Sequence, residues 1–196
     1  AMFPQTKGQA VALSVLGNNF LGQGLRLCSM QDTLFCGPLP DDLVVRYNGF
    51  LKDDERYFEG QSTQVYLNCN ILGSVDYVFG TARAFFKNCT FTSVNDGRTT
   101  AYVAAPAHSL KQDVGFVFLN CTFNAESDVL DNTTYLARPW RDFGKSTFIS
   151  CKYSSHVKDT VFDKWNDTFR DKTARFEYYP KLKGFNAVNW AKPINR

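Results

Sequence analysis

VFLNCTF, residues 117–123, is one of four copies of a seven-residue pattern. The other copies are VYLNCNI (65–71), FFKNCTF (85–91) and TFISCKY (147–153). Every copy has an aromatic residue three positions before its cysteine and a large apolar residue two positions after it. Simple alternation along a strand would place these two positions on opposite faces. If both side chains are buried, the chain must bend between them.

The residue before each cysteine is suited to such a bend. It is Asn in three copies and Ser in the fourth, and Asn tolerates the left-handed backbone conformation. The pattern returns after 20, 32 and 30 residues, and repeats of this length are typical of solenoids. Alternating, β-forming residues dominate and no convincing amphipathic helix is found, so the sequence predicts an all-β parallel β-helix.

The repeat also suggests a role for four of the six cysteines. Cys69, Cys89, Cys121 and Cys151 occupy the same position of the pattern. We expect them to stack from coil to coil as small buried hydrophobic side chains and not to form disulfides. The state of Cys28 and Cys36, which lie eight residues apart, is left open.

Length and composition limit the classes of protein. The 196 residues are enough for one domain with a real core, so we expect a single domain over 1–196. The net charge of +3 is too small to predict a nucleic-acid partner, although it is compatible with a polyanionic substrate. No apolar run approaches the roughly 18 residues that a membrane span needs, and no signal peptide is recognised. We therefore expect neither nucleic acid nor membrane as a partner.

Polar side chains interrupt the apolar pattern at four points. They are Gln9 in GQAVALSV (8–15), Gln31 with Asp32 in SMQDTLF (29–35), Asp76 in GSVDYVFG (73–80), and Arg138 with Trp140 in TYLARPW (134–140). Asp76 stands among apolar and small residues, where an ionised side chain is costly to bury without a partner. Arg138 and Trp140 are two apart and share one face if the segment is extended.

These four motifs, in this order, resemble those of the pectin methylesterases (pectinesterases), carbohydrate esterases that demethylate pectin. The match runs from about Gln9 to Trp140, with a weaker tail through WNDTFRDKTARFEYY (165–179). The resemblance implies a right-handed parallel β-helix, which agrees with the repeat. It also implies a secreted, extracellular aspartyl esterase that hydrolyses the methyl esters of homogalacturonan, the polymer of pectin, with no metal or organic cofactor.

The resemblance assigns five catalytic roles. Asp76 is the nucleophile, and Asp32 is the general acid and then the general base. Gln9 and Gln31 donate amide N–H groups to the oxyanion. Arg138 pairs with Asp76 and orients it. Each residue also has a structural alternative: a turn-capping carboxylate for Asp32, stacked ladder amides for the two glutamines, and a structural ion pair for Arg138 with Asp76.

Four further residues are candidates for binding the substrate. Trp140 offers a flat apolar face to a sugar and its methyl ester, or else belongs to the core. Tyr77 and Phe79 flank Asp76 and either line the groove or pack in the core. Arg83 follows closely enough to meet a galacturonate carboxylate.

The chain departs from the family pattern in two places. Residues 36–61 are an insertion between Asp32 and Asp76, and we expect them to project as a loop beside the cleft. Family members also have coils before the strand that follows Gln9, so we expect a β-helix that is N-terminally truncated relative to the family. Its first coil would then associate with a second copy or with a partner segment. Residues 154–196 are expected to pack on the helix as a C-terminal tail.

Other functions remain open from the residues alone. Parallel β-helices also carry pectate lyases, which need calcium-binding carboxylates, and polygalacturonases, which need clustered Asp residues. The pairs Asp41–Asp42 and Asp53–Asp54 both lie in the insertion, so these two activities are less favoured. A non-catalytic pectin-binding or structural β-helix fragment is the main alternative to the esterase.

Overall fold

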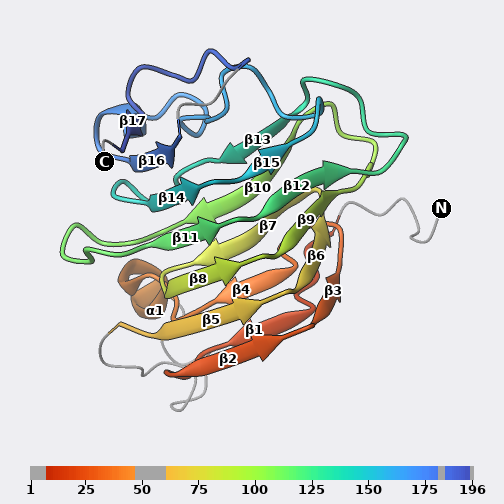
Figure 1. The fold of residues 1–196 in the computed structure, drawn as a ribbon. Coiled ribbons are helices and arrows are strands. Elements are labelled where there is room, and N and C mark those ends of the chain that lie inside the picture. The colour runs from red at the N-terminus through yellow and green to blue at the C-terminus, as the bar shows by residue number, and fades with distance from the viewer. Residues whose placement is uncertain (1–7, 47–60, 181–183, 195–196) are drawn as a thin grey trace.

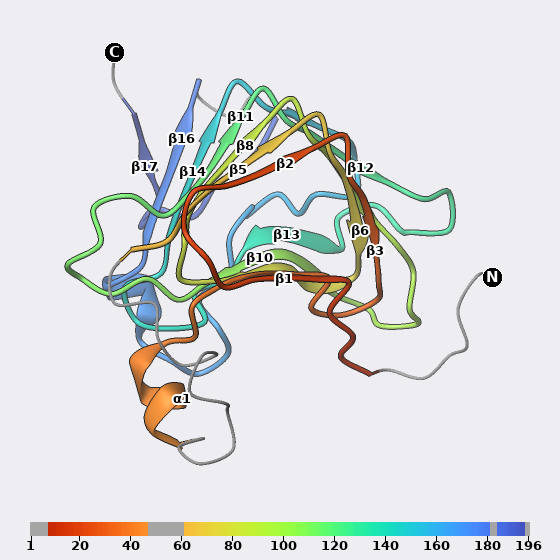
Figure 2. The same ribbon diagram turned by 90° about the horizontal axis from the view of Figure 1, so that it is seen from below.

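The computed structural model describes residues 8–46, 61–180 and 184–194. In these residues the chain winds through three parallel sheets that form the three sides of a prism (Figure 1). Figure 2 looks along the stack and shows the three sides meeting at their corners. The parallel β-helix predicted from the repeat is therefore confirmed. None of the helices in this part of the chain is long and apolar enough to cross a membrane.

The first sheet carries the polar motifs. Its strands, in spatial order, are β1 (Leu13–Val15), β4 (Leu34–Cys36), β7 (Val75–Gly80), β10 (Ala101–Pro106) and β13 (Thr134–Ala137).

The second and third sheets carry the two halves of the cysteine pattern. The second has the order β17 (Lys192–Pro193), β16 (Arg175–Tyr179), β14 (Lys145–Ile149), β11 (Phe116–Leu119), β8 (Arg83–Lys87), β5 (Thr63–Leu67) and β2 (Phe20–Gln23). The third has the order β15 (Lys152–Tyr153), β12 (Thr122–Ala125), β9 (Thr90–Ser93), β6 (Asn70–Gly73) and β3 (Arg26–Cys28).

The predicted bend lies at the corner between the second and third sheets. Its residues adopt left-handed conformations, with φ of 53° at Asn68, 55° at Asn88, 53° at Asn120 and 52° at Ser150. This corner turns the aromatic residue before the cysteine and the apolar residue after it into the same core. The prediction that each unit is strand, bend and strand is confirmed.

Aromatic ladders fill the core behind these bends. Tyr66, Phe86, Phe118 and Phe148 occupy equivalent positions of consecutive coils, and their rings stack at centroid distances of 4.8, 5.0 and 4.7 Å. A second ladder joins Phe91 to Phe123 at 5.0 Å and Phe123 to Tyr153 at 5.4 Å. Each buried aromatic side chain removes a large apolar area from water, so these ladders supply much of the driving force for stacking the coils.

The cysteines of the pattern lie beside these ladders as free thiols, as predicted. The Sγ atom of Cys121 donates to the Phe86 carbonyl of the preceding coil at 3.3 Å, and Cys151 does the same to the Phe118 carbonyl at 3.4 Å. Cys28 and Cys36, left open above, are also free thiols. Burial raises the pKa of the Cys36 thiol to about 12, so this thiol is protonated and unreactive.

The insertion between β4 and β5 leaves the stack intact. Its described part contains a short helix, α1 (Asp41–Arg46), that projects from the prism (Figure 2). Residues 47–60 of the insertion lie outside the described part. Strands β4 and β7 still pair, with Leu34 opposite Val78, so the insertion does not shift the register of the first sheet.

The C-terminal region contributes strands to the second sheet. Residues 175–179 form β16, which pairs with β14 along its full length, and β17 extends the same sheet. Phe176 and Ala191 belong to the core. Residues 175–179 and 192–193 therefore continue the second sheet of the solenoid. The C-terminal region also contains the short 3₁₀ helix η1 (Arg170–Lys172).

The opposite end of the stack consists of β1, β2 and β3, each the last strand of its sheet within the described residues. Self-association through this coil stays a prediction.

Candidate active site

Pairing between adjacent coils brings three of the polar motifs together at the N-terminal ends of strands in the first sheet. Gln9 pairs with Gln31, and Gln31 pairs with Val75, as isolated parallel bridges. The Asp32 backbone N–H donates to the Val75 carbonyl at 3.0 Å. Gln31 and Asp32 therefore lie alongside Val75 and Asp76 in adjacent coils, although the two Asp residues are 44 positions apart in the chain.

Asp76 has the partner that a buried carboxylate requires. Arg138 donates from Nε to Oδ1 at 2.8 Å and from Nη2 to Oδ2 at 2.6 Å. This bidentate pair is shielded from water, since the side chains of Arg138 and Asp76 are only 13% and 9% exposed. Two parallel charge-assisted hydrogen bonds fix the carboxylate plane as well as its charge.

Two aromatic rings hold the guanidinium of Arg138. Its Cζ lies 3.7 Å from the centroid of the Tyr102 ring and 3.9 Å from that of Trp165. Cation–π contacts at such distances stabilise a guanidinium in a fixed position. The orientation of Asp76 therefore depends on β10, which carries Tyr102, and on the C-terminal region, which carries Trp165.

Both carboxylate residues have unusual backbone conformations. Asp32 has φ of 63° and Asp76 has φ of 51°, in the left-handed region that most side chains avoid. Asp is among the non-glycine residues that enter this region most readily. Strained backbone of this kind clusters at functional sites, because the fold must hold a side chain in a direction that a regular strand does not give.

The two carboxyl groups have different electrostatic environments. Burial and the negative charge of Asp76 raise the pKa of Asp32 to about 7, against the opposing effects of Arg138, Gln9 and Arg98. Burial also raises the pKa of Asp76, while the hydrogen bonds and charge of Arg138 act against that rise. Because both Asp76 oxygens accept hydrogen bonds from one guanidinium, Asp76 is the carboxylate that stays ionised. An ionised and a protonated carboxyl group can thus coexist side by side near neutral pH.

The two glutamines differ in their contacts. Gln9 is exposed and hydrogen bonds with the Asp32 side chain. Gln31 is half-buried, and its Oε1 accepts a hydrogen bond from Nη2 of Arg98 at 2.9 Å. The backbones of Gln9 and Gln31 pair in adjacent coils, and the part of the two amides in catalysis stays a proposal.

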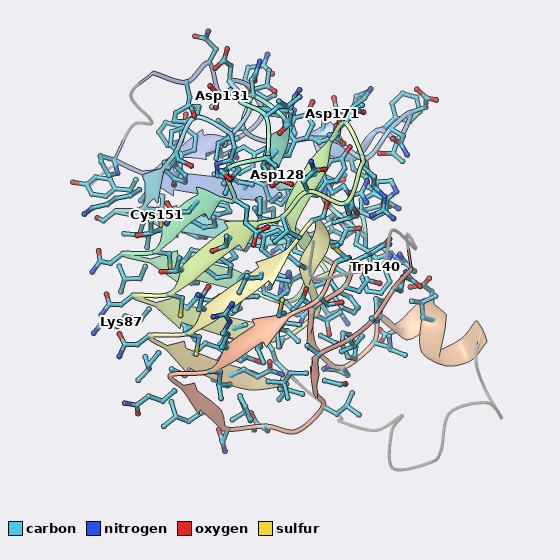
Figure 3. The ribbon with its side chains drawn as sticks, turned by 90° about the vertical axis from the view of Figure 1, so that its right-hand side faces the viewer. Lys87, Asp128, Asp131, Trp140, Cys151 and Asp171 are labelled. Atoms are coloured by element: carbon cyan, nitrogen blue, oxygen red, sulfur yellow. The ribbon has the colours of Figure 1, made fainter. Side chains whose placement is uncertain are left out.

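Aromatic side chains form an apolar wall in the segments that follow Asp32, Asp76 and Arg138. The half-buried Phe79 ring packs on Phe35 at 4.9 Å and on Trp140 at 5.8 Å between centroids. Arg141 lies over the Trp140 ring at 4.9 Å and forms an ion pair with Asp42 of α1 at 2.8 Å. Helix α1 therefore lies beside Trp140, as Figure 3 shows, and part of the insertion does border this wall.

Two predicted binding residues are not brought to the site. Tyr77 is fully buried in the core and its hydroxyl hydrogen bonds with Ser93 at 3.3 Å, so its prediction as a groove residue is wrong. The physical reason is that Tyr77 follows Asp76 in β7 and takes the inward direction. Arg83 lies in the second sheet and donates to Gln61 Oε1 at 2.5 Å, so it does not join the carboxyl pair.

Three residues at the site escaped the sequence motifs: Tyr102, Trp165 and Arg98. Tyr102 lies in TAYVAAPAHS (100–109), outside the four motifs, and Trp165 is the first residue of the weaker tail over 165–179. Arg98 precedes β10 in a polar loop with no recognisable spacing to Gln31. Within the described residues, no cluster of three or more His, Cys, Asp or Glu side chains could hold a metal ion.

Comparison with known proteins identifies the family of the chain. The family model described as Pectinesterase matches residues 42–191. The chain is 32% identical over 172 residues to "Putative pectinesterase 14" of Arabidopsis thaliana, covering 87% of this chain and 42% of the relative. It is 33% identical over 141 residues to "Pectinesterase" of Ralstonia solanacearum, covering 70% of this chain and 31% of the relative. The chain thus spans less than half the length of these relatives.

Solved structures share the fold. Pectin methylesterase from carrot superposes with a TM-score of 0.79 at 22% identity, over 97% of this chain and 56% of that chain. A pectin methylesterase in complex with a hexasaccharide superposes with a TM-score of 0.67 at 21% identity, over 95% of this chain and 56% of that chain. These matches confirm the right-handed parallel β-helix. Since the family model covers most of the sequence, the chain belongs to the pectinesterase family.

Proposed function

We propose that this protein hydrolyses the methyl esters of homogalacturonan, releasing methanol and leaving free galacturonate in the polymer. The observation that carries this proposal is the adjacent pair Asp32 and Asp76, of which only Asp76 is held by a bidentate guanidinium. A general acid and a carboxylate nucleophile need these opposite protonation states at one pH.

In the first step, an oxygen of Asp76 attacks the carbonyl carbon of the methyl ester. The tetrahedral intermediate carries a negative oxygen, which the amide N–H groups of Gln9 and Gln31 stabilise. When the C–O bond to the methoxy group breaks, Asp32 gives its proton to the leaving oxygen and methanol departs. The products are an anhydride between Asp76 and the galacturonyl group, and an ionised Asp32.

In the second step, the ionised Asp32 takes a proton from water, and the resulting hydroxide attacks the galacturonyl carbonyl. The anhydride bond breaks, Asp76 leaves as a carboxylate, and Arg138 stabilises the charge that returns to it. Asp32 is again protonated, so the cycle closes without a metal or an organic cofactor.

The substrate site follows from the same surface. Phe79 and Trp140 present apolar ring surface beside the carboxyl pair, which suits the methyl ester and the sugar face. The related pectin methylesterase solved with a hexasaccharide supports an oligogalacturonide as the ligand. Pectin is a component of the plant cell wall, so the proposed place of action is extracellular, in the modification or degradation of that wall.

The test is a methanol-release assay on highly methylated pectin with a parallel measurement of polymer length. We expect methanol to be released while the length distribution stays constant. Cleavage of the chain, or an unsaturated product that absorbs ultraviolet light, would show a lyase or a polygalacturonase instead. Pectin binding with no methanol above the level of Asp76→Asn would show a non-catalytic binding module.

A further inference from the structure

Arg98 links the loop before β10 to the polar motif before β4. Its Nη1 contacts Asp96 Oδ2 at 2.8 Å, and its Nη2 donates to Gln31 Oε1 at 2.9 Å, across 67 residues of sequence. The Arg98 backbone N–H also donates to Asp96 Oδ1 at 3.1 Å. The Asp96 side chain is only 4% exposed. Asp96 therefore fixes Arg98, and Arg98 in turn contacts Gln31.

This contact determines which way the Gln31 amide points. A guanidinium has five N–H donors and no acceptor, so the amide atom that faces it must be the oxygen. Because the amide is planar, holding Oε1 against Arg98 turns the Nε2 group away from Arg98. A charge-assisted hydrogen bond to the oxygen also withdraws electron density from the amide nitrogen, which strengthens its N–H groups as donors.

We propose that Arg98 is a positioning residue that aims and polarises the Gln31 amide as an oxyanion donor. This inference rests on the proposed esterase function and adds a residue to it. Preorganised donors act most strongly when they need not rotate as charge develops, and a free glutamine side chain would lose that advantage. Arg98 itself need not touch the substrate.

The electrostatic setting of the carboxyl pair agrees with this placement. The positive charge of Arg98 lowers the pKa of both Asp32 and Asp76, although other effects on each group are larger. Arg98 is therefore near enough to the reacting groups to act on them through space, in addition to its contact with Gln31.

A cavity next to Arg98 makes a chemical rescue experiment possible. Its volume is about 280 Å³, and Arg98 lines it together with Asn95, Thr99, Asp128 and Leu130. Figure 3 labels Asp128. Replacing Arg98 by alanine would join the vacated space to this cavity, so that a free guanidinium ion could reach Gln31 and Asp96.

The test compares Arg98→Ala, Gln31→Ala and the double variant, with Arg26→Ala, at the exposed first position of β3, as the matched control. We expect kcat for methanol release to fall by about 10²-fold in Arg98→Ala, as for the loss of one oxyanion donor, with KM and Tm nearly unchanged. In the Gln31→Ala background, Arg98→Ala should lower kcat far less than it does in the parent, because only the smaller effect of the Arg98 charge on Asp32 and Asp76 remains. Guanidinium at millimolar concentration should restore activity to Arg98→Ala and not to the double variant. Additive losses in the double variant would overturn the proposal.

An activity-independent measurement separates this inference from the proposed function. The ¹⁵N signal of the Gln31 side-chain amide is identified by its loss in Gln31→Ala. We expect it to shift and broaden in Arg98→Ala, to stay unchanged in Arg26→Ala, and to return toward its original position with guanidinium. An unchanged Gln31 signal in Arg98→Ala would refute the positioning role. If the parent protein releases no methanol, the esterase proposal fails, while this signal still decides whether Arg98 holds Gln31.

Discussion

Arg138 reaches Asp76 across the ring of Tyr102. Strand β10, which carries Tyr102, lies between β7 and β13 in the first sheet, and Arg138 directly follows β13. Its guanidinium lies 3.7 Å from the Tyr102 ring centroid and forms two hydrogen bonds with Asp76. A buried ion pair of this kind contributes little net stability, because desolvation offsets its attraction. Its geometry is therefore better explained by the chemistry of Asp76 than by the stability of the fold.

Asp76→Asn should abolish methanol release, with a fall of more than about 10³-fold, because an amide is a poor nucleophile. Asn is isosteric and tolerates the positive φ at this position, so the fold and pectin binding should persist. Methanol release and the thermal unfolding temperature are measured together, since the change leaves Arg138 buried without its counter-charge. Asp142→Asn, at a carboxylate that is 66% exposed, is the control. Full activity in Asp76→Asn would exclude Asp76 as the nucleophile.

Trp165→Ala should lower kcat by roughly 3- to 30-fold, the equivalent of one partly desolvated cation–π contact. The reason is that Arg138 would lose one of its two aromatic neighbours and hold Asp76 less rigidly. Trp165→Phe keeps a ring and should retain most of the activity. Trp165 is half-buried and its φ of 72° is equally unfavourable for Ala and Phe, so the thermal unfolding temperature is measured beside kcat to separate lost packing from lost positioning. Equal activity of the Ala and Phe variants would argue against this role.

The release of methanol in a single turnover should depend on the protonation of Asp32. The pKa of Asp32 is raised to about 7, so the proton that the leaving methanol needs is present below that pH and lost above it. We expect the rate of the methanol burst to fall tenfold per pH unit well above pH 7. Hydrolysis of the acyl-enzyme needs the ionised form and should rise over the same range. A burst rate that keeps increasing up to pH 9 would contradict Asp32 as the general acid.

The free energy of unfolding should also depend on the protonation of Asp32. The folded-state pKa of Asp32 is higher than that of an unfolded Asp, near 3.8, so the folded state binds the proton more tightly between the two values. Its contribution to the free energy of unfolding is therefore present below about pH 4 and lost as the pH rises toward 7, with a slope of at most about 1.4 kcal/mol per pH unit. Asp32→Asn removes this slope. Denaturant unfolding from pH 4 to 8 compares the two proteins, and parallel stability curves would count against the raised pKa.

The corner residues offer a test of the fold. Asn88 has φ of 55°, and a β-branched residue there should destabilise the protein by about 1–2 kcal/mol. Asn88→Gly, which is free to adopt positive φ, should be close to neutral. The β-branched variant is Asn88→Val. Its control is Lys87→Val, which introduces valine one position earlier, within strand β8. Chemical unfolding gives the differences, and similar losses for Asn88→Val and Lys87→Val would mean that the bend is not the cause.

The repeat made the architecture predictable from sequence. Each copy of the cysteine pattern combines two aromatic or apolar positions with an intervening Asn or Ser, and this local combination requires a corner. The ladders of Phe86, Phe118 and Phe148 then follow, because identical coils stack with identical side chains in register. The strands of the C-terminal region could not be predicted in this way. This region lacks the cysteine pattern, yet β16 pairs with β14 through backbone hydrogen bonds, which depend little on side-chain identity.

The site depended on contacts that no local pattern encodes. Motifs predicted that Asp32, Asp76 and Arg138 belong together, but the bidentate geometry, the enclosure of Arg138 by Trp165 and the positive φ of both Asp residues exist only in the folded chain. Tyr77 was misassigned because the left-handed backbone at Asp76 interrupts the alternation of the strand. The direction of the Tyr77 side chain could therefore not be predicted from that of Asp76. Arg98 was missed because its partner Gln31 lies 67 positions away.

The sequence by itself determined the solenoid, the bends and the candidate carboxylates, because these depend on residue type and on spacing within one coil. Only the tertiary structure decided which residues meet at the site. The physical reason is that strand pairing, and not distance along the sequence, determines which residues are neighbours in a stack of coils. The insertion after β4 lengthens the chain between Asp32 and Asp76 and leaves their coils in contact, because a loop can leave and re-enter the stack without changing the register.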